Sequence, residues 1–118
     1  MLNMDMIGRL SDSTKKLVVY GVGTSPVFVP MIDSLKTNLK IKKDSAGVGP
    51  SDQTSFYLKD IPVLHFFSGT HSDYHKPSDD ENLINYPGEV AIMNYIVQLV
   101  QRLDDKGKLN FNTRFYLR

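Results

Sequence analysis

The feature that most constrains this sequence is a strongly apolar segment that leads directly into a polar loop rich in histidine and aspartate. Residues 61–67 (IPVLHFF) are β-branched and aromatic and lie between turn-forming residues, a pattern that predicts a buried strand. The loop at residues 69–80 (GTHSDYHKPSDD) follows immediately. Proteins of the α/β class carry their chemistry on loops at the carboxyl ends of buried strands. This segment therefore predicts both an α/β fold and a functional site.

Strands and helices are predicted to alternate along the chain. Apolar runs predict strands at residues 1–10, 17–22, 39–43 and 61–67. Periodic apolar residues predict helices at residues 26–39, 53–59 and 87–104. This alternation indicates α/β layers with a mostly parallel sheet. After the last helix, the tail carries a weak strand pattern at residues 111–117.

Polar side chains mark the predicted starts of the helices. Ser25, followed by proline, predicts the N-cap of the first helix. Either Ser51 or Asp52 can cap the second helix. Ser78, with Glu81 three residues later, fits a capping box ahead of the last helix.

Each of the two longer helices is predicted to bury one apolar face. The face of the first helix consists of Phe28, Met31, Ile32, Leu35 and Leu39. On the last helix the predicted stripe consists of Val90, Met93, Val97 and Val100, widened by Ile92, Ile96, Leu99 and Leu103. A stripe this wide predicts a helix packed firmly on a sheet.

Composition narrows the class of protein and the chemistry of the site. A chain of 118 residues is long enough for one domain with a core. The net charge is +1 without a basic block, which gives no indication of a nucleic acid or membrane-surface partner. No apolar run approaches the length of a membrane span, and the start lacks the pattern of a signal peptide. Because cysteine is absent, a metal ion would be held by histidine and carboxylate side chains.

The candidate site residues group in the polar loop. His71 and His75 are the candidate ligands, with Asp73, Asp79 and Asp80 near enough in sequence to orient an imidazole. A further acid, Asp5, interrupts the apolar residues of the first strand. It is either a site residue or an edge-strand carboxylate that faces water.

Four motifs together resemble the M28 family of zinc aminopeptidases. They are residues 3–9 (NMDMIGR), 49–56 (GPSDQTSF), 61–64 (IPVL) and 74–80 (YHKPSDD), in the order and at the spacing of that family. The resemblance implies a three-layer α/β sandwich with a mixed, mostly parallel sheet, as in zinc-dependent exopeptidases. It also implies that the chain is the C-terminal part of one peptidase domain, with residues 1–104 as core and 105–118 as tail. A strand that starts at the first residue agrees with this expectation.

The resemblance implies a site with two zinc ions and five ligands, of which two match this chain. Asp5 and His75 match ligands of different zinc ions, and Asp79 matches the acid that orients the loop or His75. The family's other ligands and its glutamate general base match nothing here, and no Glu-Glu pair occurs in the sequence. We therefore expect this chain alone to lack peptidase activity and to contain no catalytic base of its own.

The resemblance also implies which residues contact the peptide substrate. Candidates for the substrate pocket are Val48, Gly49, Ser51, Gln53 and Tyr74. Gln53 departs from the family, in which many members carry histidine at this position. The preferred substrate side chain cannot be read from these residues.

Three functions remain open at the level of sequence. The first is a fragment of a zinc aminopeptidase that releases N-terminal residues from peptides. The second is a glutaminyl-cyclase-like acyltransferase, which keeps the site but uses one zinc ion. The third is a non-catalytic binding module that retains the fold. We also expect the isolated chain to self-associate, and the family resemblance alone favours an extracytoplasmic location.

Overall fold

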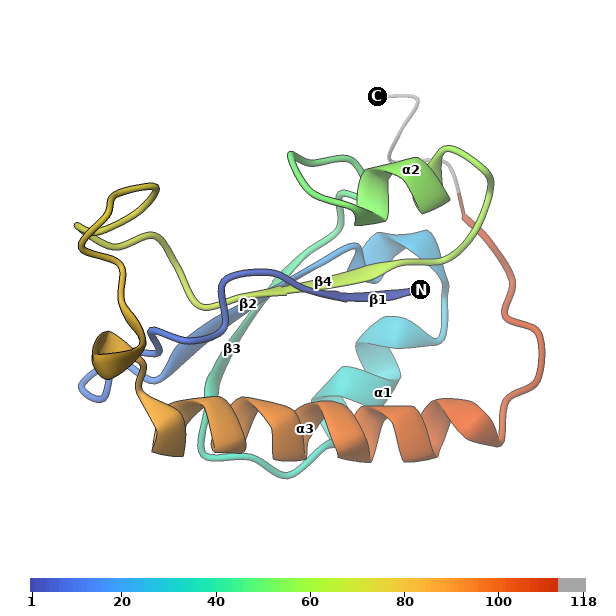
Figure 1. The fold of residues 1–118 in the computed structure, drawn as a ribbon. Helices are drawn as coiled ribbons and strands as arrows, with labels where there is room; N and C mark the ends of the chain where they lie inside the picture. Colours follow the sequence, from blue (N-terminus) through green and yellow to red (C-terminus); the bar gives the residue numbers. More distant parts are fainter. Residues whose placement is uncertain (113–118) are drawn as a thin grey trace.

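The computed structural model describes residues 1–112, which form a four-stranded sheet with helices on both faces (Figure 1). The strands are β1 (Leu2–Met4), β2 (Lys16–Tyr20), β3 (Lys40–Asp44) and β4 (Leu64–Phe67), in the spatial order β1-β4-β2-β3. β1 pairs with β4 and β2 pairs with β3 in parallel, whereas β2 and β4 are antiparallel. The predicted mixed, mostly parallel sheet is therefore confirmed.

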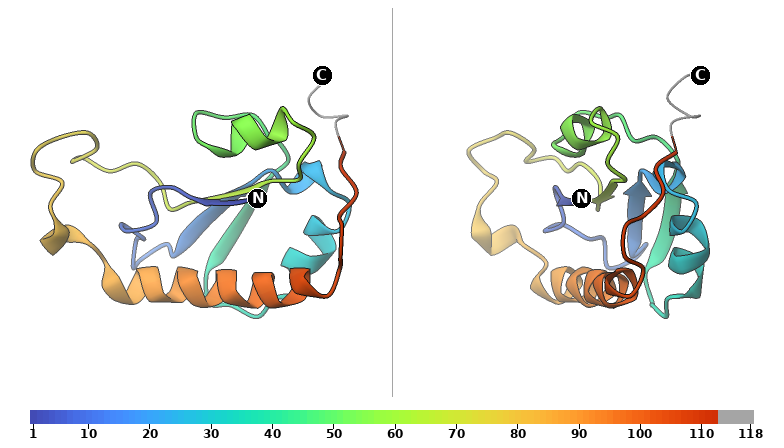
Figure 2. Two further views of the ribbon diagram at one scale, coloured as in Figure 1. Left: turned by 45° about the vertical axis from the view of Figure 1, so that its right-hand side comes forward. Right: turned by 90° about the vertical axis from the view of Figure 1, so that its right-hand side faces the viewer.

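Helices lie on both sides of this sheet, as expected for a three-layer fold. α1 (Phe28–Ser34) and α3 (Tyr86–Asp104) lie on one side and α2 (Gln53–Tyr57) lies on the other (Figures 1 and 2). Short 3-10 helices precede α1 and α3, namely η1 (Val22–Thr24) and η2 (Glu81–Leu83). The main core lies between the sheet and the pair α1 and α3. Its central members are Leu17, Val19, Leu64, Phe66, Phe28, Ile32, Ile92, Tyr95, Ile96 and Leu99.

The burial of the strands explains their sequence patterns. In β4 the consecutive residues Leu64, His65 and Phe66 are all buried, because this strand lies inside the sheet and is covered on both faces. In β2 only Leu17 and Val19 are buried, so this strand alternates. β3 is an edge strand rich in lysine, as predicted.

The first helix is shorter than predicted and begins later. Ser25 lies in an extended conformation between η1 and α1 and does not cap a helix with its side chain. The helix ends at Ser34, and Thr37 then accepts a hydrogen bond from the Leu39 backbone N–H (3.0 Å). Such local bonds compete with helical ones. The predicted apolar face is nevertheless buried, since Leu35 and Leu39 reach the core from the segment after the helix.

The other two predicted caps are also wrong, because the hydroxyl groups have carboxylate partners. Ser51 donates its hydroxyl proton to Asp5, and Asp52 makes no side-chain cap hydrogen bond. Ser78 donates to Asp73, and Glu81 begins a 3-10 helix instead of completing a capping box. In a cap the hydroxyl oxygen accepts a hydrogen bond from a backbone N–H, whereas both hydroxyl groups here are oriented toward carboxylates, to which they donate.

The predicted stripe of the last helix faces solvent. Val90, Met93, Val97 and Val100 are each exposed by 38% or more. The buried face consists of Gly88, Ile92, Tyr95, Ile96 and Leu99. The helix therefore has two apolar stripes, and the residues expected only to widen the first are the ones that pack on the sheet. Periodicity alone cannot distinguish two stripes on one helix.

The exposed stripe lies on the side of α3 away from α1. Gln98 donates to the Lys36 carbonyl (3.1 Å) and Arg102 donates to the Ser34 hydroxyl (2.8 Å), so the flank that carries them faces α1. Figure 2 shows α1 on the β3 side of the molecule and β1 at the opposite edge. We call this region the open side: the edge of β1 that pairs with no other strand within residues 1–112, together with the exposed stripe Val90, Met93, Val97 and Val100. Within residues 1–112, no helix is long and apolar enough to span a membrane.

The strand predicted at residues 111–117 lies mostly outside the described part of the chain, which ends at residue 112, and positions 111 and 112 are not in a strand. The Asn112 backbone N–H donates to the Thr24 carbonyl (2.8 Å), which ties the segment after α3 to η1. Phe111 packs against Tyr57 of α2, with ring centroids 5.3 Å apart.

The open side predicts self-association of the isolated chain. An apolar stripe of this length and an unpaired strand edge both favour contact with another chain. The double variant Val90→Glu/Val97→Glu should therefore be monomeric at concentrations where the parent chain forms dimers or larger species. Sedimentation equilibrium over a concentration series measures this difference.

Asn94→Glu/Gln101→Glu is the matched control, because it adds the same two charges to exposed polar positions of the same helix. It should leave association unchanged. A parent chain that stays monomeric throughout, with a cooperative melt above about 60 °C, would contradict the prediction.

Candidate functional site

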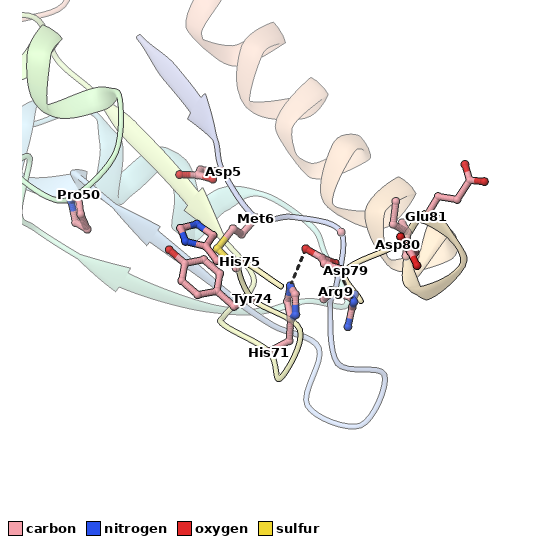
Figure 3. A pocket seen from close by; sticks show the side chains of 12 residues that line it. Asp5, Met6, Arg9, Pro50, His71, Tyr74, His75, Asp79, Asp80 and Glu81 are labelled. Atoms are coloured by element: carbon pink, nitrogen blue, oxygen red, sulfur yellow. Dashed lines mark hydrogen bonds and ion pairs between the residues drawn. The ribbon is translucent and has the colours of Figure 1, made fainter. Parts of the chain in front are cut away.

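A cavity of about 600 Å³ lies beyond the carboxyl ends of β1 and β4. Asp5 directly follows β1, and the loop at residues 69–80 follows β4. Because these neighbouring strands are parallel, both segments emerge at the same edge of the sheet. Asp5 and His75, the two predicted metal ligands, both line this cavity, together with His71 and Asp79 (Figure 3).

Asp5 is held by a chain of hydrogen bonds that starts in α2. Ser51 Oγ donates to Asp5 Oδ2 (2.6 Å). Asn3 Nδ2 donates to both Ser51 Oγ (2.8 Å) and Gln53 Oε1 (2.9 Å). A carboxylate can only accept, so the serine must donate and the asparagine must donate in turn. The direction of every bond in this chain is therefore fixed by Asp5.

This chain of hydrogen bonds also includes two of the predicted pocket residues. Ser51 donates a hydrogen bond to Asp5. Gln53 is buried (1% exposed), and its side-chain carbonyl oxygen accepts a hydrogen bond from the Asn3 amide. Sequence reasoning did not identify Asn3. The available signal was its spacing, because residues two apart in a strand point to the same face.

His75 occupies an unusual backbone conformation. Its φ is +54°, in the left-handed region that costs a residue with a Cβ atom roughly 1–2 kcal/mol. The imidazole is stacked on the Tyr74 ring, with centroids 3.9 Å apart. Conformations of this kind persist where the surroundings enforce them, and they are frequent at functional sites.

Asp79 contacts Arg9 and His71. Its Oδ1 accepts a hydrogen bond from Arg9 Nη2 (2.9 Å), and its Oδ2 lies 3.8 Å from His71 Nε2. Arg9 Nη1 also donates to Asp73 Oδ2 (3.0 Å). Among the described residues, Asp79 makes no hydrogen bond to His75, so its contacts support a role in holding the loop. Sequence reasoning did not identify Arg9 as a site residue. The available signal was that Arg9 is the last residue of the first motif, residues 3–9.

Asp73 is a centre of the loop's hydrogen bonding. Ser78 Oγ donates to its Oδ1 (2.6 Å), and Arg9 binds its other oxygen. The hydrogen bond from Ser78 and that from Arg9 hold the pKa of the Asp73 carboxyl below its usual value. Asp73 is therefore ionised at neutral pH and bound within the loop.

The residues at the cavity are of the types that bind zinc, but they are fewer than a stable zinc site needs. An imidazole and a carboxylate are typical zinc ligands, but a stable site has about three protein ligands or more. Within residues 1–112, no three histidine or acidic side chains lie close enough to hold a metal ion together. Asp5 and His75 can supply one ligand each, and further ligands would have to come from other residues.

A second pocket of about 420 Å³ adjoins the cavity. Four of the five predicted pocket residues line it, namely Val48, Gly49, Gln53 and Tyr74. Aromatic side chains that were not predicted line it as well, namely Tyr20, His65 and Phe67. His65 is buried (6% exposed) and stacks on Tyr20, with centroids 5.4 Å apart. Burial lowers the pKa of His65, although nearby Asp5 acts in the opposite direction.

The fold is of the α/β class, and it places a polar cavity and an adjoining aromatic pocket beyond the carboxyl ends of β1 and β4, where such folds carry their sites. The chain belongs to peptidase family M28, whose sequence model matches residues 1–100. It is similar in fold to two crystal structures of LapA from Legionella pneumophila, one of them described as an aminopeptidase. The first superposes with a TM-score of 0.63 at 23% identity over 82% of this chain, and the second with 0.65 at 22% over 86%.

This chain spans 28% and 31% of the length of those two structures. No curated protein matches the sequence significantly. The resemblance to M28 drawn from the four motifs is thus confirmed, as is the fold class.

Loss of the Gln53 carbonyl should destabilise the chain. Gln53→Leu leaves an amide proton of Asn3 without its acceptor, which we expect to lower the free energy of unfolding by about 1–3 kcal/mol. Urea denaturation measures the change. The matched control is Gln101→Leu, which removes an exposed glutamine on α3 and should cost about 0.5 kcal/mol or less. Equal losses in the two variants would contradict the role assigned to Gln53.

Zinc should bind this chain weakly by itself. Asp5 and His75 offer fewer ligands than a stable site needs, so calorimetric titration with zinc at neutral pH should give at most weak binding. A sub-micromolar affinity with one ion per chain would show that the loop at residues 69–80 is a site on its own.

Proposed function

We propose that this chain contributes part of the metal site and of the substrate pocket of a zinc aminopeptidase of family M28. The observation that carries the proposal is the meeting of Asp5 and His75 at one cavity. Their segments are 70 residues apart in sequence, and the parallel pairing of β1 with β4 brings them together. The match of the M28 family to residues 1–100 supports the same assignment.

The proposed chemistry is metal-assisted hydrolysis of the first peptide bond of a substrate. Zinc ions, when bound, would polarise the scissile carbonyl and lower the pKa of a bound water. Asp5 would hold one zinc ion and His75 the other. Ser51 keeps one carboxylate oxygen of Asp5 in a hydrogen bond and thereby fixes the orientation of this ligand, the kind of support that metal-binding side chains need.

The neighbouring pocket is proposed to receive a side chain of the peptide. Its walls include Val48, Tyr20, Phe67 and Tyr74, which offer apolar and aromatic surface. It shares Asp5, Met6 and Tyr74 with the cavity. A peptide whose first carbonyl lay near Asp5 could therefore place a side chain in this pocket.

A general base is the part of the mechanism that this chain does not supply. Moving the water proton to the leaving amine requires a positioned carboxylate or comparable group. The resemblance to M28 implies that this group is a glutamate of a Glu-Glu pair, and the sequence contains no such pair. Hydrolysis is therefore proposed for a protein in which further M28 residues complete the site.

The small number of ligands favours one alternative. With two ligand residues at the cavity, the chain could serve as a binding module that retains the M28 fold without catalysis. The two proposals differ in whether the polypeptide that carries this chain also carries the remaining ligands and the base.

In a protein that has those residues, His75→Ala should abolish aminopeptidase activity and leave the fold nearly intact. His75 lies on an exposed loop, so its removal costs little packing, but it removes a metal ligand. Asp79→Ala should lose about 10–100-fold, because it acts through the loop. Hydrolysis of an aminoacyl chromogenic substrate, measured together with zinc content, checks both values.

His71→Ala is the matched control, because this histidine lies on the same loop and lines the same cavity. It should keep substantially more activity and zinc than His75→Ala. An inactive His71→Ala beside an active His75→Ala would reverse the assignment. Wild-type protein that binds zinc without hydrolysing any aminoacyl substrate would favour the binding module.

A further inference from the structure

Arg9 joins two acids that lie on either side of His75. Its Nη1 donates to Asp73 Oδ2 (3.0 Å) and its Nη2 donates to Asp79 Oδ1 (2.9 Å). We propose that Arg9 is a positioning residue, which closes the segment from Asp73 to Asp79 and thereby holds the His75 imidazole at the cavity. The inference rests on the proposed function, because it concerns the presentation of a proposed metal ligand.

The environment of Arg9 shows that the guanidinium is built into the loop. Its side chain is 18% exposed, and its Nε is buried without a hydrogen-bond partner among the described residues. Ser78 donates to the second oxygen of Asp73, which fixes that carboxylate for the arginine. A planar guanidinium can bind two carboxylates at once in fixed geometry, which a lysine ammonium cannot do with the same precision.

The backbone of the loop explains why His75 needs such a contact. At φ +54°, His75 is in a conformation that a residue with a side chain leaves unless its surroundings enforce it. The hydrogen bond from the Lys76 N–H to Asp73 O (2.9 Å) closes a turn that contains His75, and the one from the Asp79 N–H to Lys76 O (3.1 Å) closes the next turn. The side chains at the ends of this pair of turns are the two acids that Arg9 binds.

Arg9 also connects the loop that carries His75 to the segment that carries Asp5, the other proposed ligand. It follows Asp5 by four residues, and the segment between them is anchored at Met6, whose carbonyl accepts from the Ser68 N–H (3.0 Å) and hydroxyl (2.6 Å). Both ends of the segment are therefore attached to the polypeptide that follows β4. Through these attachments, Arg9 sets the position of the His75 loop relative to Asp5.

The test is an NMR comparison of the 118-residue chain with Arg9→Gln and Arg9→Lys. In Arg9→Gln, the ring-proton shifts of His75, which the stacked Tyr74 ring perturbs in the parent, should move most of the way to free-histidine values. The amides of Tyr74, Lys76 and Asp79 should exchange at least tenfold faster. Arg9→Lys keeps the charge but binds one acid at a time, so it should give intermediate values.

Lys43→Gln is the matched control, because it breaks the Lys43–Asp33 ion pair elsewhere on the surface. It should change neither readout. If Arg9→Gln does not fold, Asp73→Asn/Asp79→Asn removes the same contacts from the other side and should give the same shifts. Unchanged His75 shifts and amide exchange in a folded Arg9→Gln, or in the double asparagine variant, would overturn the proposal.

A zinc titration followed on the His75 ring protons then tests the link to metal binding. Zinc should bind His75 in Arg9→Gln at least tenfold more weakly than in the parent chain, the loss expected when support for a ligand is removed. Equal zinc affinity in both chains would show that Arg9 orders the loop without positioning the ligand. If zinc shifts no His75 signal even in the parent, the isolated chain has too few ligands for this readout, as its zinc prediction allows, and the shift and exchange data alone decide the role of Arg9.

Discussion

The parallel pairing of β1 with β4 is the interaction on which the rest of the site depends. In its register Asn3 lies opposite His65 and Met4 lies opposite Phe66, and the Asp5 N–H donates to the Phe66 carbonyl (3.3 Å). This pairing brings the end of a three-residue strand beside the end of the most buried strand. A shift of one residue would turn Asn3 and Asp5 to the opposite face of the sheet, away from Ser51 and Gln53. The buried residues of β4 thus fix the position of a carboxylate that makes no contribution to the core.

The site is held mainly by polar contacts between segments and only slightly by regular structure. Asp5 lies after its strand, and His75 lies in a loop of turns. Two residues in left-handed conformations, Met6 and His75, change the direction of the chain at these two places. Each is fixed by a partner from elsewhere: Ser68 binds the Met6 carbonyl, and Arg9 binds the acids around His75. The geometry of the cavity is therefore a property of these contacts as much as of the sheet.

The sequence predicted the four strands, the three-layer α/β architecture and the family, because these follow from apolar patterns and from motifs in fixed order. It also predicted that Asp5 and His75 belong together. It failed where the outcome depends on the three-dimensional surroundings of a residue. Ser51 and Ser78 both fit helix caps by residue type, but their hydroxyl groups are oriented toward the carboxylates of Asp5 and Asp73, to which they donate. Val97 and Ile96 are equally apolar, and only the position of the sheet decides that Ile96 is buried. Arg9 and Asn3 were missed because their roles depend on residues more than 45 positions away.

The buried glutamine at position 53 has a consequence for how this region responds to acid. Histidine gains a proton between about pH 5 and 8, and in its charged form both ring nitrogens are donors. A charged histidine in this place could not accept the amide proton of Asn3, and the chain of hydrogen bonds to Asp5 would have to reorganise. Glutamine does not titrate, so the bonds from Gln53 through Asn3 and Ser51 keep the same protons across that range. The hydrogen bonds that hold Asp5 therefore come from side chains that neither gain nor lose a proton in this range.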